Sequence, residues 1–138
     1  MLSLTKRKPQ VIFASIIFVV VVDQISKYLF AGFGSFLCNR GGPFGLDFKP
    51  LVISVLTLSL FVYLLRKENR NNNVFGYSLL IAGGASNLID RFLLGCVRDF
   101  ISVTHLFPTF NLADTAITLG VLVVLWEAFA SRNKRDET

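Results

Sequence analysis

Four long apolar segments run along the chain, and short polar stretches separate them. They cover approximately Val11–Phe30, Leu51–Leu65, Val74–Leu94 and Asn111–Ala130. Each approaches the ~20 residues that a helix needs to cross ~30 Å of hydrocarbon. The second is short, so Lys49 and Arg66 would have to extend their side chains toward the headgroups. The pattern predicts one all-α integral membrane domain over residues 1–138, with four transmembrane helices.

Composition and charge agree with this pattern and give it an orientation. Hydrophobic residues make up 53% and charged residues 17% of the chain, a balance that excludes an ordinary soluble domain. The N-terminus, the second connection and the C-terminal tail hold three lysines or arginines each, and the other two connections hold fewer. Both termini are therefore expected in the cytoplasm. Because the basic residues gather at the ends of apolar segments, the net charge of +5 does not predict nucleic-acid binding.

Polar side chains interrupt three of the four segments at a similar depth. A charged group inside a spanning helix costs at least ~2.5–3.5 kcal/mol, so each one needs a reason. At ~1.5 Å per residue, Asp23, Lys27, Asn87 and Asp90 lie ~18–24 Å above the inner face, and Asp114 lies ~5 Å below the outer end of its helix. Spacings of three or four place several of them on shared helical faces: Asp23 with Lys27, Gly83 with Asn87 and Arg91, and Asn111 with Asp114. The sequence predicts one polar pocket in the outer half of the membrane.

We expect most of these side chains to have structural roles. The ammonium of Lys27 keeps a neighbouring carboxylate ionised, so Asp23 and Lys27 are expected to form a structural or substrate-positioning pair. Asp90 beside Arg91 invites the same interpretation. Asn87 is most simply a hydrogen-bonding strut between helices.

The small residues in the sequence have plain interpretations as well. Gly83, Gly84 and Ala85 are expected to let helices approach closely. Cys38 and Cys96 would both lie toward the outside, where a disulfide can form. We expect instead two unpaired, small apolar side chains.

Asp99 and Asp114 differ from the other carboxylates. Asp99 lies in the alternating stretch 96–101, which predicts a strand that folds back along the outer surface. Asp114 opens the fourth segment, and the connection that turns at Pro108 brings the two together. Arg98 need not neutralise Asp99, because neighbours in an extended stretch point to opposite faces. The pair could share a proton, one as base on a water and the other protonating a carbonyl, or could be two independent structural acids.

Other catalytic chemistries find little support in the sequence. His105 is the only histidine, so neither a zinc site nor a Ser-His triad is predicted.

Four sequence blocks occur in a fixed order along these segments: Asp23-Gln24 with Lys27; Asn39 to Gly45; Asn87 to Arg91 continuing through Gly95, Val97, Asp99 and Phe100; and Phe110 to Asp114. With these blocks, the chain resembles the bacterial lipoprotein signal peptidases, or signal peptidases II, which are aspartic peptidases of the membrane. The resemblance implies four transmembrane helices, cytoplasmic termini and a small extracytoplasmic β/loop cradle.

The resemblance also implies that no metal and no organic cofactor is needed, and it implies residue roles. Asp99 and Asp114 match the family's catalytic pair. Ten further positions match residues that shape the site or contact substrate: Asp23, Lys27, Asn39, Gly41, Gly83, Asn87, Asp90, Arg91, Asn111 and Ala113. Family members cut a prolipoprotein just before a cysteine that carries diacylglycerol, at the outer side of the bacterial inner membrane. The implied partners are this lipidated substrate and membrane lipid, and a monomer is the default because nothing in the sequence demands an interface.

Three features depart from the family pattern. Only about a dozen residues separate Lys27 from Asn39, where family members usually have more, so the extracytoplasmic sheet should be small. Gly42-Pro43 replaces a pair of small residues and should stiffen its loop. Ser86 stands where a glycine is common and should slightly open a helix contact.

Two other classes of function compete with the peptidase. A small proton-coupled transporter also uses buried carboxylates, although it has no need of Asp99 outside the spans. A non-catalytic assembly or immunity protein would tolerate replacement of either Asp99 or Asp114.

Overall fold

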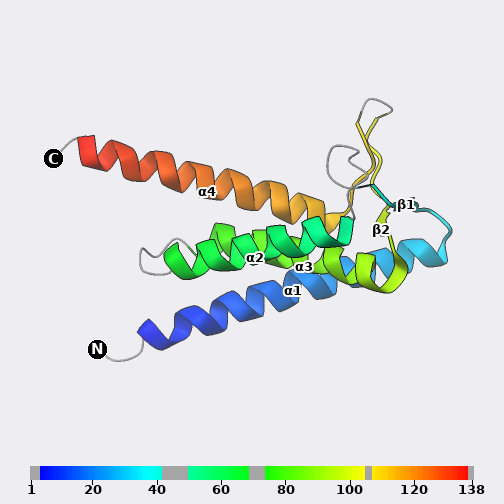
Figure 1. Ribbon diagram of the computed structural model, residues 1–138, viewed down its shortest axis with the longest axis horizontal. Helices are drawn as coiled ribbons and strands as arrows, with labels where there is room; N and C mark the ends of the chain where they lie inside the picture. Colours follow the sequence, from blue (N-terminus) through cyan, green and yellow to red (C-terminus); the bar gives the residue numbers. More distant parts are fainter. Residues whose placement is uncertain (1–3, 42–49, 69–73, 105–106, 137–138) are drawn as a thin grey trace.

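Each of the four predicted apolar segments forms a helix. The computed structural model describes residues 4–41, 50–68, 74–104 and 107–136. In that part of the chain the elements follow the order α1 (Leu4–Gly32), β1 (Leu37–Asn39), α2 (Pro50–Glu68), α3 (Phe75–Leu94), β2 (Val97–Asp99) and α4 (Leu112–Asp136). The start of α1 and the end of α4 lie at one end of the molecule, and both strands lie at the other (Figure 1). Gly42-Pro43 and His105 lie outside the described residues.

Three of the four helices, α1, α2 and α4, are longer than the apolar segments that predicted them. Helix α1 begins at Leu4 rather than Val11, and α2 continues to Glu68 rather than Leu65. The added turns are rich in lysine, arginine and glutamate, which are good helix formers. The end of an apolar segment therefore marks where the contact with lipid would stop, and the helix runs on into the polar region.

The outer surfaces of the helices are strongly apolar. Residues Gln10–Gly32 and Leu112–Ala130 are each long and apolar enough to cross a membrane, and α2 contains a shorter apolar stretch, Val52–Leu64. Large side chains such as Phe18 and Trp126 are 68% and 77% exposed. A soluble protein rarely exposes so much apolar surface, so these faces suit lipid.

Helix α3 is the central helix and contacts α1, α2 and α4. Glycines allow α3 and α4 to pack closely: a Cβ at Gly83 would collide with the carbonyl oxygen of Ala113, and one at Gly120 would lie 2.8 Å from the carbonyl oxygen of Gly76. The prediction that Gly83 permits close helix packing is confirmed. This contact brings the N-terminus of α4 against the middle of α3.

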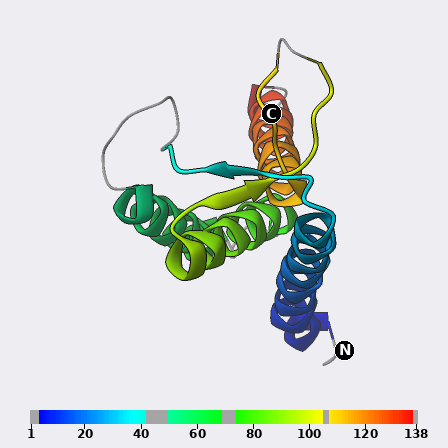
Figure 2. The same cartoon turned by 90° about the vertical axis from the view of Figure 1, so that its right-hand side faces the viewer.

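The two strands pair across the end of the helices (Figure 2). They run antiparallel, with Leu37 opposite Asp99, and an isolated bridge between Ile101 and Phe110 continues the extended chain toward α4. The predicted strand around Asp99 is confirmed, and the sheet is small, as the short segment after Lys27 predicts.

The expectation of two unpaired cysteines was wrong. Cys38 and Cys96 form a disulfide, with their Cα atoms 5.4 Å apart. The pairing of β1 with β2 brings them together over a sequence separation of 58 residues. That long-range pairing is not visible in the local sequence pattern.

Candidate active site

Four carboxylates gather at the end of the molecule that carries the strands. Asp23 comes from α1, Asp90 from α3, Asp99 from β2 and Asp114 from α4. All but Asp114 are buried, and Asp114 is half-buried. The single polar pocket predicted from depth is confirmed by the contacts described below.

Asp23 is held by a cation and by two hydrogen-bond donors. Lys27 Nζ lies 2.7 Å from Asp23 Oδ2, and both side chains are fully buried. Lys27 also donates to Asn87 Oδ1 at 2.8 Å, while Asp23 Oδ1 accepts the backbone N–H of Ala113 at 2.8 Å. The predicted pairing of Asp23 with Lys27 is confirmed, and the pair connects α1 to both α3 and α4.

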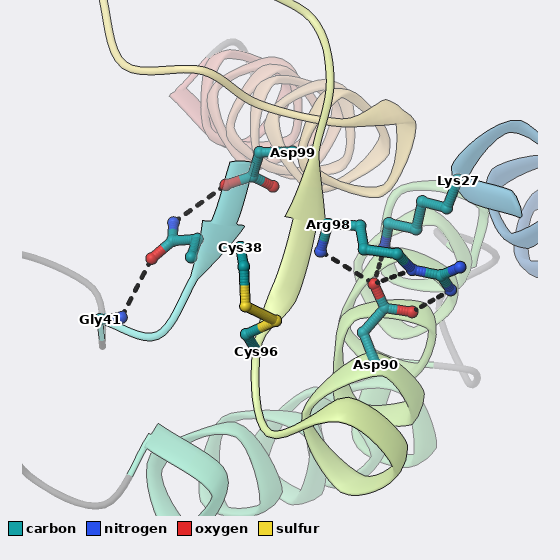
Figure 3. Close-up of a disulfide and its surroundings, with 8 residues drawn as sticks. Lys27, Cys38, Gly41, Asp90, Cys96, Arg98 and Asp99 are labelled. Atoms are coloured by element: carbon teal, nitrogen blue, oxygen red, sulfur yellow. Dashed lines mark hydrogen bonds and ion pairs between the residues drawn. A yellow bond between two sulfur atoms is a disulfide. The ribbon is translucent and has the colours of Figure 1, made fainter. Parts of the chain in front are cut away.

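Asp90 is also ion-paired, but not with its neighbour Arg91. Arg98 Nη2 lies 2.7 Å from Asp90 Oδ1, its backbone N–H and Nε both donate to Oδ2, and Lys27 lies 3.5 Å away (Figure 3). The pairing expected from sequence adjacency was wrong, because consecutive helical side chains point in different directions. Arg98 is turned away from Asp99, as the alternation of a strand predicts.

Sequence reasoning missed two members of this network, Gln24 and Ser86. Gln24 Nε2 donates to Asp90 Oδ1 at 3.0 Å and to Ser86 Oγ at 2.9 Å, and Gln24 Oε1 accepts from Arg98 at 2.9 Å. Ser86 is buried and its hydroxyl donates to Asp23 Oδ2 at 2.6 Å. Ser86 therefore adds a hydrogen bond where we expected only a looser helix contact. Gln24 follows Asp23 in the first sequence block, and this position could have indicated that Gln24 belongs to the network.

Asp99 and Asp114 are held in a different way, by amide groups. Asn39 Nδ2 donates to Asp99 Oδ2 at 3.0 Å, and Asn111 Nδ2 donates to Asp99 Oδ1 at 2.7 Å. Asn87 Nδ2 donates to Asp114 Oδ1 at 2.8 Å. Within the described part of the chain, neither carboxylate forms an ion pair. These two carboxylates are therefore free of a committed cation, as the sequence predicts.

Asn111 is the N-cap of α4 and links the two carboxylates. Its Oδ1 accepts the backbone N–H of Asp114 at 2.9 Å, and Asp114 Oδ2 accepts the backbone N–H of Asn111 at 3.2 Å. This reciprocal pair is a capping box, which satisfies two otherwise unpaired N–H groups at a helix start. The helix begins at Leu112, one residue after the predicted span. The cap fixes Asp114 in the same contact network as Asp99.

The surroundings of Asp99 favour its protonated form. Burial raises the pKa of this carboxyl above its ordinary value, and the nearby charge of Asp114 raises it further. Hydrogen bonds from Asn39 and Asn111 act in the opposite direction but do not cancel the effect of burial on the pKa.

A cleft of about 290 Å³ opens beside this cluster, between α2 and the α3–α4 pair. Its polar part includes Asn39, Gly41, Asn87, Arg91 and Asp114. The remainder is mainly apolar: Ile53, Ser54, Thr57, Leu58, Phe61, Gly84 and Ile117. The Gly41 N–H turns back onto Asn39 Oδ1 at 3.1 Å, which fixes the asparagine side chain (Figure 3). The cleft therefore places the carboxylate of Asp114 beside a mainly apolar surface.

Arg91 lines this cleft and forms no ion pair with the described carboxylates, although the charges of Asp114, Asp99 and Asp90 act on it. Its Nε is buried and has no hydrogen-bond acceptor among the described residues. Such a group is costly to bury unless something else binds to it. A bound peptide carbonyl or other acceptor would satisfy it.

Known proteins of one family are similar in sequence to this chain. A model of the family described as signal peptidase (SPase) II matches residues 15–130. The lipoprotein signal peptidase of Thermodesulfovibrio yellowstonii is 35% identical, over 82% of this chain and 90% of that protein. The lipoprotein signal peptidase of Rickettsia africae is 32% identical, over 88% of this chain and 74% of that protein.

Solved structures agree with the sequence matches. A bacterial membrane enzyme solved by the in meso method at 2.3 Å resolution has a TM-score of 0.78 and 28% identity, over 94% of this chain and 93% of that one. A second bacterial membrane enzyme, solved at 1.9 Å, has a TM-score of 0.72 and 26% identity, over 86% of this chain and 92% of that one. This chain, with its pocket of paired and unpaired carboxylates, belongs to the signal peptidase II family.

Proposed function

We propose that this protein removes the signal peptide from prolipoproteins, and that it does so as an aspartic endopeptidase with Asp99 and Asp114 as the catalytic pair. Membership of the signal peptidase II family supports the peptidase activity and the substrate class. One observation supports the catalytic pair: Asp23 and Asp90 are ion-paired, whereas Asp99 and Asp114 are held by neutral amides. A neighbouring cation favours the charged form of a carboxylate and makes it a poorer proton carrier, whereas a carboxylate held by neutral amides exchanges a proton more readily.

The two aspartates take different roles in this mechanism. Asp99 holds the proton that the pair shares, because burial favours its neutral form. Asp114 is then the base: it takes a proton from a water, whose oxygen attacks the scissile carbonyl carbon while Asp99 protonates the carbonyl oxygen. In the second step, Asp114 gives its proton to the leaving nitrogen, and Asp99 recovers one from the tetrahedral intermediate. The C–N bond breaks and both aspartates return to their starting states.

The cleft suits a substrate that is apolar and extended. Its apolar lining, including Ile53, Phe61 and Ile117, would accept the hydrophobic residues of a signal peptide. Arg91 would donate to a backbone carbonyl near the scissile bond. In this arrangement cleavage occurs just before the lipidated cysteine, and the diacylglyceryl group stays in the membrane and fixes the depth of the substrate.

The proposed orientation has all four helices in the bacterial inner membrane, both termini in the cytoplasm and the site on the extracytoplasmic side. The distribution of lysine and arginine supports this orientation. The Cys38–Cys96 disulfide gives independent support, because disulfides persist outside the cytoplasm and are rare within it.

A direct assay tests the proposal. The purified protein in detergent is incubated with a diacylglyceryl-modified prolipoprotein, and cleavage is followed as a mobility shift on a gel. We expect cleavage by the wild type and by Asp136→Asn, a control at the far end of α4, and none by Asp99→Asn or Asp114→Asn. Robust cleavage by either active-site variant would refute the catalytic pair, and equal cleavage of the unmodified precursor would refute lipid-dependent recognition.

Proton-coupled transport is not favoured. The family is one of peptidases, and Asp99 lies on strand β2 outside the helices. A transporter would gain nothing from a carboxylate at that position.

A further inference from the structure

Strand β1 is held in place by few buried contacts. All three of its residues, Leu37–Asn39, are exposed, whereas Val97 and Asp99 of β2 are buried. A two-stranded pair of this length is marginally stable by itself, and joining segments that are distant in sequence costs entropy. The position of β1 therefore needs a further restraint.

The disulfide supplies that restraint, on the face opposite the active site. Side chains alternate between the two faces of a strand pair. The register places Cys38 diagonally across from Cys96 on one face, where the disulfide joins them (Figure 3). It places Asn39 diagonally across from Asp99 on the other face. A slip of one residue would turn Asn39 away from Asp99. The disulfide and the Asn39–Asp99 hydrogen bond therefore depend on the same register.

We propose that the Cys38–Cys96 disulfide is a positioning element of the active site, which holds Asn39 against Asp99, so that full activity requires the oxidised chain. The inference rests on the proposed peptidase function. Asn39 is itself exposed, so water competes for its amide once the strand is released. The disulfide keeps the amide in place without help from burial.

The redox step is a simple exchange. Cys38 is an exposed residue and Cys96 is buried, so a reductant approaches the disulfide from the side of Cys38. Two electrons and two protons convert the disulfide into two thiols, and the reductant, a phosphine or a dithiol, is oxidised in the same step. A thiol oxidant such as oxidised glutathione reverses the reaction and is itself reduced to two thiols.

Release of β1 has a defined electrostatic consequence. The polar and charged groups that face Asp99 come from each neighbouring element: Asn39 of β1, Lys27 of α1, Arg91 of α3, and Asn111 and Asp114 of α4. Of these, the group carried by β1 is Asn39. Burial raises the pKa of Asp99 and the hydrogen bond from Asn39 lowers it. Where Asp99 stays buried against the helices, loss of that hydrogen bond lets the pKa rise further. Since Asp99 must be protonated to act, the alkaline limb of the activity profile should move to higher pH.

The test compares three forms of the full-length protein in detergent with the diacylglyceryl-modified precursor: oxidised wild type, wild type reduced with a phosphine, and the Cys38→Ser/Cys96→Ser variant. We expect kcat to fall roughly tenfold in the last two forms, with little change in KM. Each loses one hydrogen bond to Asp99, which becomes charged as it gives its proton to the carbonyl oxygen. Their alkaline limb should move to higher pH. Oxidised glutathione should restore the reduced wild type, and the serine variant should respond to neither reagent.

A matched variant isolates the amide. Asn39→Ala in the oxidised chain should reproduce the shift of the alkaline limb, and its reduction should add no further shift. Hydrogen exchange of the β1 amides, followed by mass spectrometry, should rise on reduction while exchange in α3 does not. This measurement does not depend on substrate cleavage.

Three other outcomes would each overturn a different claim. Unchanged kcat and pH profile in the reduced and serine-substituted forms would overturn the positioning role, even if their unfolding temperature falls. Unchanged exchange in β1 would overturn the claim that the disulfide holds the strand. Failure of the oxidised wild type to cleave would refute the proposed peptidase, and the exchange result would still decide whether the disulfide restrains β1.

Discussion

Asn111 performs two tasks that substitution can separate. Its Oδ1 caps α4 by accepting the N–H of Asp114, and its Nδ2 donates to Asp99 Oδ1 at 2.7 Å. Alanine removes both contacts. Serine can still cap the helix, because its hydroxyl accepts the same backbone N–H, but it has no amide to offer Asp99. Comparing Asn111→Ala with Asn111→Ser therefore separates the effect of the helix cap on stability from the effect of the amide donation on catalysis.

The structure gives a magnitude for each task. Loss of an N-cap costs about 1 kcal/mol, which lowers the unfolding midpoint by a few degrees. A hydrogen bond to a charged group contributes about 1.5–3 kcal/mol, and Asp99 becomes charged as it gives its proton to the carbonyl oxygen. If the whole of that contribution acts on the transition state, its loss lowers kcat roughly 10- to 150-fold.

The assay combines thermal unfolding in detergent with cleavage of the lipidated precursor. We expect both variants to lose kcat to a similar degree, and only Asn111→Ala to lose the stability of the cap. If Asn111→Ser recovers wild-type kcat together with stability, the amide donation to Asp99 has no role in catalysis and the argument fails. If Asn111→Ala is as stable as the wild type, the capping assignment is wrong.

Further predictions follow from the same contacts. Activity should decline on the alkaline side at a pH above the ordinary range of aspartate, because burial raises the pKa of Asp99; a kcat profile with that limb in the ordinary range would contradict this. Lys27→Met should cost about 3–5 kcal/mol of stability in thermal unfolding, because buried Asp23 loses its cation, and leucine at both positions should recover most of the loss. Gly83→Ala should cost about 1–3 kcal/mol by overpacking against α4, and a stable alanine variant would show that the helices can separate. Ser86→Ala should cost about 1–3 kcal/mol, because Asp23 loses a buried donor, and unchanged unfolding would exclude that role.

Periodicity and depth were sufficient to predict most of the architecture. Apolar segments marked the four helices, and spacings of three and four placed Asp23, Lys27, Asn87 and Asp114 in one pocket. These predictions succeed because they depend on helix geometry alone. The strand around Asp99 was predictable for a similar reason, since alternation over a few residues is a local signal.

Contacts between distant segments were beyond the reach of the sequence. Asp90 pairs with Arg98 rather than Arg91, because the turn after α3 carries the arginine back over its own helix. Cys38 finds Cys96 only through the β1–β2 pairing. The expected partner of Asp90 was its neighbour Arg91, and the cysteines were expected to be two small apolar side chains. In both cases the tertiary fold supplied the partner.

The pairing of Asp23 with Lys27 also bears on how the chain enters the membrane. The two side chains lie four residues apart on α1 and contact each other at 2.7 Å, so this helix carries its own counter-ion. Among the described residues, Asp90 of α3 is ion-paired by other elements, with Lys27 of α1 and Arg98 of β2. In the proposed topology α1 can therefore be inserted as a nearly neutral unit, while α3 gains its charge balance once α1 is already present. The order of the helices along the chain thus matches the order in which their buried charges can be neutralised during synthesis.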